Sequence, residues 1–338
     1  MTYADANASA PVDESAFVAW LEPHRRELQV HCYRMLGSFE ESEDLVQETF
    51  LRAWRGRTGF SSGNRSALRA WLYRIATNAC LDVLRKRPRR ILPPELGPAG
   101  DPTAPPPPPA ELPWLQPYPD RLLEGIAPPE DEPGAVVVAR ETIELAFLAA
   151  IQHLPPRQRA VLILREVLGW SAKDTASLLE TTVVSVNSAL QRARATMRDR
   201  LPERRTEWRR SAEATEQEHE LLQRYVDAHE RADVHGLAQL LREDALLTMP
   251  PHPTWYAGRD AILVATRQGF DPAFGRLRSV IAGANLQPAV AHYLCPPGES
   301  GYRPLALDVL SVEGGVVAEI HSFVHPELFP AFGLPAKL

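Results

Sequence analysis

Apolar residues in the first quarter of the chain recur at helical spacing. One stripe ends at Gly37, and a second begins after Ser38 or Ser42, either of which can cap a helix. A third helix is predicted over residues 67–86. The apolar positions of the three helices are Leu28, Cys32, Met35 and Leu36, then Leu45, Val46, Phe50 and Trp54, then Leu68, Leu72, Ile75, Ala79 and Val83. Residues 14–90 are therefore predicted to form an all-α module.

A second helical pattern covers residues 136–205. A short helix is predicted over residues 172–179, and a break at residues 180–182 separates it from a long helix over residues 183–201. The apolar positions of the long helix step by three and four, and they are Val183, Val186, Leu190, Ala193 and Met197. A short helix, a tight break and a longer helix with a polar outer face are typical of a helix-turn-helix.

From residue 214 to residue 338 the pattern changes from helices to short strands. Two helices, over residues 221–232 and 234–242, precede five β-like runs. The runs cover residues 245–249, 277–282, 289–294, 305–312 and 316–324. Gly314 and Gly315 lie between the last two runs and predict a hairpin. We therefore expect an α+β domain with a curved antiparallel sheet.

Proline marks the segment between the two helical modules. Residues 91–134 hold 15 of the 32 prolines, and proline both blocks helices and lacks an amide donor. Residues 91–135 are predicted to be an acidic linker, long enough to hold two modules tens of ångströms apart. Its apolar island at residues 112–119 contains a Trp and a Tyr and is expected to dock onto a folded domain. Residues 1–13 are predicted to be disordered.

Composition limits the class of protein. The 338 residues are 44% hydrophobic and 24% charged, which suits two or three globular units. No apolar run reaches the length of a membrane span. Cys32, Cys80 and Cys295 are far apart in sequence, so they indicate neither a disulfide framework nor a metal knuckle. We expect a soluble, cytoplasmic protein without a membrane partner.

Charge is sorted along the chain. The net charge is +3 over residues 1–90, −7 over 91–139, +4 over 140–213 and −6 over 214–338. Two basic segments divided by an acidic one suggest two surfaces that meet a polyanion. Each charged segment, considered by itself, is equally well explained as a solvated face.

The motifs in both helical modules resemble one bacterial family. Residues 44–54 (DLVQETFLRAW) and 71–78 (WLYRIATN) resemble region 2 of extracytoplasmic-function sigma factors, and residues 154–161 (LPPRQRAV) with the helix ending QRAR resemble region 4. The remainder is similar to the SnoaL-like cone fold. This fusion and residues 114–117 (WLQP) resemble the mycobacterial SigG-type subgroup. The resemblance implies two partners, promoter DNA and the RNA polymerase core with its β′ clamp helices and β flap.

An acidic patch lies in the first module. Asp44, Gln47 and Glu48 stand at i, i+3 and i+4, so they share one helical face. In the family that the sequence resembles, this helix binds the basic clamp coiled coil of β′. A solvated helix face is the alternative.

Strand opening calls for basic, polar and aromatic side chains near each other, because phosphates and unstacked bases must both be held. The loop at residues 60–66 and the helix after it supply these types. By resemblance, the residues at the minus-10 element are Asn64, Arg65, Trp71, Arg74 and Asn78. Trp71 is equally suited to the core.

A recognition helix presents its outer face to base edges in the major groove. By resemblance, the residues that read the minus-35 element are Asn187, Ser188, Gln191 and Arg192. Arg194 and Arg198 are expected to contact phosphates.

More than one role is compatible with the sequence of the C-terminal domain. Candidates for a pocket are Trp255, Tyr256, His292, Asp308, His321 and His325. No catalytic residue, cofactor or metal is predicted. The domain is expected to act as a cis regulator, its negative charge facing the basic modules, or as a sensor of a small-molecule ligand. Two alternatives for the whole chain are a helix-turn-helix regulator and a cyclase- or isomerase-like enzyme with a DNA-binding appendage.

Overall fold

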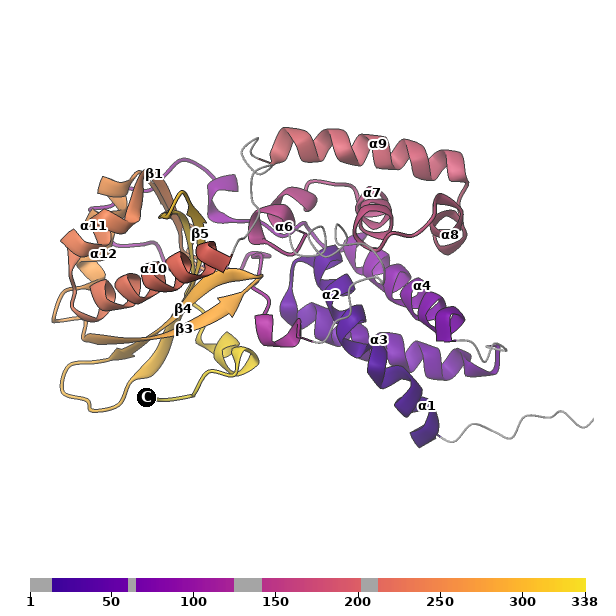
Figure 1. Ribbon diagram of the computed structural model, residues 1–338, viewed down its shortest axis with the longest axis horizontal. Helices are drawn as coiled ribbons and strands as arrows, with labels where there is room; N and C mark the ends of the chain where they lie inside the picture. Colours follow the sequence, from indigo (N-terminus) through magenta and orange to yellow (C-terminus); the bar gives the residue numbers. More distant parts are fainter. Residues whose placement is uncertain (1–13, 60–64, 125–141, 202–211) are drawn as a thin grey trace, which may run out of the picture.

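The computed structural model describes residues 14–59, 65–124, 142–201 and 212–338. Figure 1 shows two groups of helices side by side and a sheet-containing domain next to them. We refer to residues 14–90 as the first module, to residues 142–201 as the second module and to residues 212–338 as the C-terminal domain.

Four helices form the first module. Gly37 ends the second of them in a left-handed conformation (φ 70°), and the hydroxyl of Ser38 accepts the Glu41 amide at 3.3 Å to cap the third. Ser42 lies inside that helix instead. The helices are α1 (Glu14–Leu21), α2 (Arg25–Leu36), α3 (Phe39–Gly56) and α4 (Arg65–Leu84).

The second module contains the expected helix-turn-helix. Ser171 and Thr182 each accept a backbone amide and cap its two helices. Val183 was predicted to be buried, and this is wrong: it is 41% exposed because it occupies the first position of the last helix, one turn before the stripe begins to pack at Val186. The elements are α6 (Leu145–Ile151), α7 (Pro156–Leu162), the π-helical turn η5 (Ile163–Val167), α8 (Ala172–Leu178) and α9 (Val183–Arg200).

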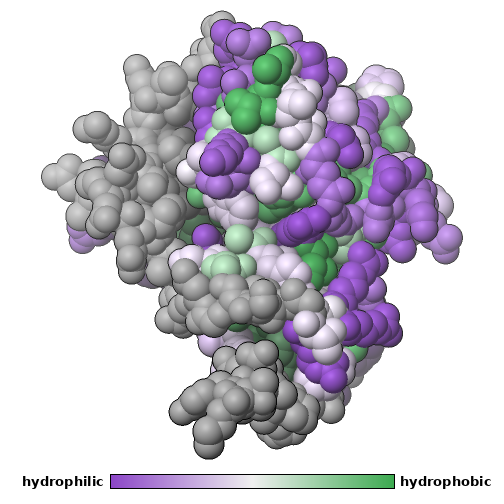
Figure 2. Space-filling view, turned by 90° about the vertical axis from the view of Figure 1, so that its right-hand side faces the viewer, coloured by the Kyte–Doolittle hydropathy of each residue, from purple (hydrophilic) through white to green (hydrophobic). Residues whose placement is uncertain are grey.

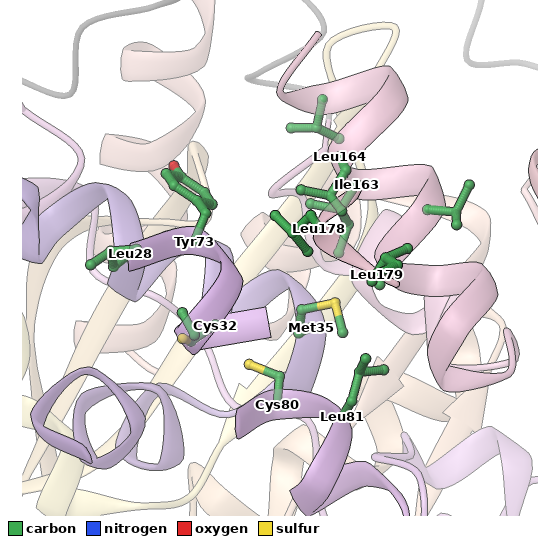
Figure 3. Packing of buried hydrophobic residues seen from close by; sticks show 14 of the residues in the cluster. Leu28, Cys32, Met35, Tyr73, Cys80, Leu81, Ile163, Leu164, Leu178 and Leu179 are labelled. Carbon is green, nitrogen blue, oxygen red and sulfur yellow. The ribbon is translucent and has the colours of Figure 1, made fainter. Parts of the chain in front are cut away.

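The two helical modules share one core instead of standing apart. In Figure 3, Leu28, Cys32 and Met35 of α2 lie with α4 residues on one side and Ile163 and Leu178 of the second module on the other. The length of the linker therefore does not separate the modules. We call this packing of α2 and α4 on α7 and η5 the closed arrangement.

Two cysteines that are distant in sequence come together in that core. Cys32 and Cys80 are both fully buried and carry free thiols. Burial and a hydrogen bond with Cys32 raise the pKa of the Cys80 thiol well above its usual value. The Cys80 thiol thus stays protonated at neutral pH and packs as an apolar core group.

The C-terminal domain is α+β with one six-stranded sheet in the order β2-β1-β6-β5-β4-β3. The expectation of an antiparallel sheet is wrong at one pair, since β1 runs parallel to β6. The apolar pattern predicts strands but does not fix their direction. The helices are α10 (Ala212–Glu230), α11 (Val234–Leu240) and α12 (Arg259–Gly269), and the strands are β1 (Leu241–Thr248), β2 (Trp255–Ala257), β3 (Arg276–Ala284), β4 (Gln287–Cys295), β5 (Arg303–Glu313) and β6 (Val316–Phe323). Strand β2 and helix α12 were not predicted.

Different segments of the chain pack on the two faces of the sheet. Helices α10, α11 and α12 pack on one face, where Val290 and Leu310 are buried. The short helix η7 (Pro326–Phe332), the linker and parts of both helical modules pack on the other face, around Tyr293 and Leu307.

The apolar island of the linker docks, as expected. Leu115 and Tyr118 are fully buried between the first module and the sheet. Asn285, in the turn between β3 and β4, accepts the Tyr118 amide at 2.8 Å and donates to Tyr33 Oη at 2.8 Å and to the carbonyl of Ile143 at 2.7 Å. One buried side chain therefore joins the C-terminal domain to the linker and to both helical modules.

Candidate functional site

The outer face of α3 carries the acidic patch. Asp44 and Gln47 are exposed, and the partly exposed Glu48 accepts a hydrogen bond from Arg52 at 2.7 Å. Leu51 lies on the same face, at i+7 from Asp44, and is 51% exposed. Leu51 was not among the residues predicted from the sequence, although a leucine between polar positions of an amphipathic helix is a recognisable signal. The face is thus an acidic surface with an exposed apolar residue at its end.

The minus-10 candidates on α4 lie in different environments. Asn78 is exposed, whereas Trp71 is half-buried and packs against the shared core. Arg74 is exposed, but it forms an ion pair with Glu180 in the turn before α9. Asn64 lies outside the described residues, as does the side chain of Arg65.

The minus-35 candidates follow the outer face of α9. Asn187, Gln191 and Arg192 are exposed, and Ser188 is half-buried. Figure 2 shows the side of the molecule where α4, α8 and the start of α9 lie, and its described surface is mostly hydrophilic with smaller apolar patches. Of the two phosphate candidates, Arg198 is exposed, whereas Arg194 forms an ion pair with Glu166 at 2.6 Å.

A buried arginine, not identified from the sequence, joins the modules. Arg159 of α7 is 2% exposed and donates to the carbonyl of Met35 in α2, and also to Gln152 Oε1 at 2.8 Å and the Gln152 carbonyl at 2.9 Å. Burial lowers the pKa of Arg159 to about 10, so it stays charged at neutral pH. Its motif, LPPRQRAV, was noted, but nothing in the pattern marked this arginine as internal.

The C-terminal domain encloses a pocket of about 400 Å³ between α10, α12 and the sheet. Three candidates, Tyr256, His292 and Asp308, line it. The other three were placed wrongly, because their side chains are engaged elsewhere. Trp255 donates to the Gly97 carbonyl of the linker, His321 is hydrogen-bonded to Thr248 at 2.9 Å, and His325 pairs with Glu327 at 2.9 Å.

A polar cluster lies at one end of this pocket. Asp308 Oδ2 accepts from Tyr225 Oη at 2.8 Å and from His292 Nε2 at 3.1 Å. His229 stands beside His292, with ring centroids 4.6 Å apart, and its Nδ1 donates to the Tyr225 carbonyl at 2.9 Å. Tyr225 and His229 were missed. They stand at i and i+4 on α10, a spacing that is a usable signal.

Burial sets the charge of this cluster. Burial and the neighbouring His292 lower the pKa of His229 to about 4, so it is neutral at pH 7. Burial raises the pKa of Asp308, but the charge and hydrogen bond of His292 outweigh it and bring the value to about 2. Ligand atoms of His229, His292 and Asp308 lie within 4.8 Å of one another, a spacing within which a metal ion fits. No metal signature is recognisable at these positions from their sequence spacing.

The comparisons with known proteins match both helical modules. The model of Sigma-70 region 2 matches residues 20–90, and that of Sigma-70, region 4 matches residues 144–197. The chain is 42% identical to the ECF RNA polymerase sigma factor SigG of Mycobacterium tuberculosis (strain ATCC 25618 / H37Rv) over 341 residues, covering 99% of this chain and 89% of SigG. It is 24% identical to SigJ of the same strain, covering 95% of each. The crystal structure of M. tuberculosis SigJ aligns with a TM-score of 0.58 at 21% identity, covering 95% of this chain and 100% of that chain.

The two sigma-type modules and the helix-turn-helix define a transcription-initiation protein. The chain belongs to the extracytoplasmic-function sigma factors of the sigma-70 family. It directs RNA polymerase core to promoters, and promoter DNA is its second partner. Its fold, including the C-terminal α+β domain, is similar to that of the SigJ crystal structure. Among the helices of the described residues, none has the length and apolarity that a bilayer crossing requires.

Proposed function

We propose that the exposed faces of α3, α4 and α9 have three different binding roles in transcription initiation. The α3 face with Asp44, Gln47 and Glu48 binds the basic clamp helices of β′, and region 4 meets the β flap. The exposed face of α4 and the loop before it hold the minus-10 element, and the outer face of α9 reads the minus-35 element. The exposure of Asn187, Gln191 and Arg192, above a stripe buried at Val186 and Leu190, is the observation that carries this proposal.

The closed arrangement has to open before both promoter elements are bound. Twenty-five base pairs separate positions minus-35 and minus-10, which is about 85 Å of B-DNA at about 3.4 Å per pair. Modules that share a core and join Arg74 to Glu180 do not span that distance. We infer that the closed arrangement is the resting form of this sigma factor, and that core polymerase and DNA favour an open one.

The C-terminal domain acts in cis in this proposal. Asn285 contacts the first module, the linker and the segment before α6, and Gln287 Oε1 accepts the Leu145 amide of α6 at 2.9 Å. These buried hydrogen bonds, together with the apolar surface around Leu115 and Tyr118, stabilise the closed arrangement. The domain is thus a regulator of the two sigma modules.

The substitution Arg192→Ala tests the proposed reading of the minus-35 element. We expect transcription from a cognate promoter to fall about 10- to 100-fold, because a base contact of an arginine is worth about 1–3 kcal/mol. The preference for one base at one position of the minus-35 element should also weaken. In vitro transcription with core polymerase on templates randomised over the minus-35 element measures both effects.

The exposed Arg198 provides the matched control for Arg192. Arg198→Ala removes the same charge from the same helix, and it should weaken transcription uniformly across sequences and reduce its salt dependence. If Arg192→Ala and Arg198→Ala give the same sequence preferences as the natural chain, α9 does not read bases through Arg192.

A further inference from the structure

The linker forms part of the wall of the pocket in the C-terminal domain. Pro106 belongs to the linker, yet it lines the pocket together with residues of α10, α12 and the sheet. On both sides of Pro106, residues 97–110 are hydrogen-bonded to the domain, and we call them the lid segment. The bonds are Trp255 Nε1 to Gly97 O (2.9 Å), Gly100 N to Trp255 O (2.8 Å), Gln268 Nε2 to Pro102 O (3.0 Å), His252 Nδ1 to Pro107 O (2.7 Å) and Ala110 N to Pro251 O (2.9 Å).

The lid segment is held by hydrogen bonds more than by burial. The side chains of residues 105–109 are exposed. Gly100 lies so close to the domain that a Cβ there would come within 2.6 Å of Thr254 Oγ1. Because little apolar surface is buried under residues 105–109, lifting them requires far less free energy than unfolding the domain. The lid segment is therefore able to open and close on a folded pocket.

The interior of the pocket combines an apolar body with unfilled acceptors. Leu237, Leu247 and Phe270 are among the apolar residues of its wall. Asp308 is 5% exposed; Ser322 lies beside its carboxylate and lowers its pKa, but Oδ1 has no hydrogen-bond partner of good geometry among the described residues. His229 donates its Nδ1 proton to the Tyr225 carbonyl, so its Nε2 carries a lone pair.

Buried hydrogen-bond acceptors that lack a partner favour a ligand that carries a hydrogen-bond donor. An acceptor without a partner in an apolar site is destabilised relative to one that is hydrogen-bonded. A ligand with a hydroxyl or amine therefore gains more at this end of the pocket than one with only carbonyl or ether oxygens. The pocket volume of about 400 Å³ and its apolar wall fit an organic molecule better than an ion alone.

We propose that this pocket binds an apolar small molecule carrying a hydroxyl or amine donor, which bonds to Asp308 and His229, and that the lid segment closes over it. A bound molecule contacts Pro106 and so stabilises the docked lid segment. By thermodynamic reciprocity, docking of the lid segment strengthens ligand binding by the same factor by which a bound ligand strengthens docking, so a change that undocks the lid segment weakens ligand binding. The pocket would thus connect a ligand to the linker that joins the two sigma modules. This inference goes beyond the proposed promoter recognition and does not depend on it.

Two probes of similar shape test, on the full-length chain, whether the pocket prefers a ligand with a hydrogen-bond donor. 2-Naphthol carries a two-ring apolar body with one hydroxyl donor, and 2-methoxynaphthalene has the same body without a donor. We expect 2-naphthol to bind about tenfold or more tightly, as measured by its fluorescence. Asp308→Asn should reduce this preference, with 2-methoxynaphthalene binding as the check that the pocket remains folded. Equal affinities of the natural chain for both probes would overturn the donor assignment. Binding of Co²⁺ alone, with no 2-naphthol binding, would overturn it in favour of a metal site.

The double variant His252→Ala with Trp255→Phe tests the lid. It removes two hydrogen bonds to the lid segment without changing a residue that lines the pocket. We expect it to weaken 2-naphthol binding about fivefold or more. In the natural chain, 2-naphthol should slow hydrogen exchange at the Gly100 and Ala110 amides. His235→Ala, at an exposed histidine of α11 bonded to Gln239, is the control. Unchanged affinity in the double variant would overturn the lid. Neither assay contains polymerase or DNA, so their failure leaves the proposed sigma function untouched.

Discussion

The double substitution Asp44→Arg with Glu48→Arg is expected to abolish binding to core RNA polymerase. Both side chains lie on the outer face of α3, and the change replaces two negative charges by two positive ones on a surface that we propose meets basic clamp helices. Like charges placed across an interface cost several kcal/mol, so the expected loss of affinity is at least about a hundredfold. Co-purification with core polymerase and in vitro transcription measure the effect.

A control of equal charge and spacing separates this effect from the change of net charge. Glu216 and Glu220 are also exposed, at i and i+4 on α10 of the C-terminal domain. Glu216→Arg with Glu220→Arg should leave core binding within about twofold of the natural chain. The proposed role of the α3 face is wrong if the two double variants bind core equally well and melt at the same temperature.

Leu51 extends the same argument to an uncharged residue. It is 51% exposed at the end of the acidic face, where its apolar side chain is accessible to a partner. Leu51→Ala should weaken core binding about tenfold without lowering the melting temperature, since little of the side chain is buried in the free protein. An unchanged affinity would restrict the core-binding surface to the charged residues.

Local features of the fold were predictable because their causes are local. Gly37 ends a helix in a left-handed conformation, and Ser38, Ser171 and Thr182 cap helices through bonds that span three residues. The buried stripe of α9 follows from its period, and only Val183, at the end of the helix, departs from it. Period and capping say which face of a helix is buried, but not which module buries it.

The closed arrangement was not predictable for that reason. Asn285 looks like an ordinary turn residue between two strands, and its left-handed φ of 58° fits that role. Its decisive partners, Tyr118 and Tyr33, lie 167 and 252 positions away in the chain. Arg159 likewise stood in a recognised motif, yet its contact with Met35 requires a docking geometry that no periodicity encodes.

The pocket shows the same division between local and distant information. His292 and Asp308 were among the pocket candidates from the sequence, and they meet because β4 and β5 are neighbours. Tyr225 and His229 come from α10, which the sequence presented only as an amphipathic helix. Trp255 was expected inside the pocket and instead donates to the Gly97 carbonyl of the linker. A single sequence shows which residues are unusual but not which of them face one another.

Asn285→Gly is expected to loosen the closed arrangement. Glycine keeps the left-handed backbone, so the substitution removes only the side chain and its three hydrogen bonds to Tyr118, Tyr33 and the Ile143 carbonyl. At about 0.5–1.5 kcal/mol each, these bonds stabilise the closed arrangement by about 2–4 kcal/mol, and their loss should raise the open population about 30-fold or more. Faster hydrogen exchange at the Tyr118 amide and a larger radius of gyration by X-ray scattering measure the opening.

Ala232→Gly is the matched control, because Ala232 also has a left-handed φ (53°) but lies in the turn between α10 and α11. It changes the backbone in the same way and removes no bond between modules, so Tyr118 exchange should not change. If the closed arrangement is the resting form, Asn285→Gly should also bind core polymerase faster than the natural chain, since the modules no longer wait for the docked domain to release them. A variant that opens by scattering but binds core no faster would show that the C-terminal domain docks without restraining initiation.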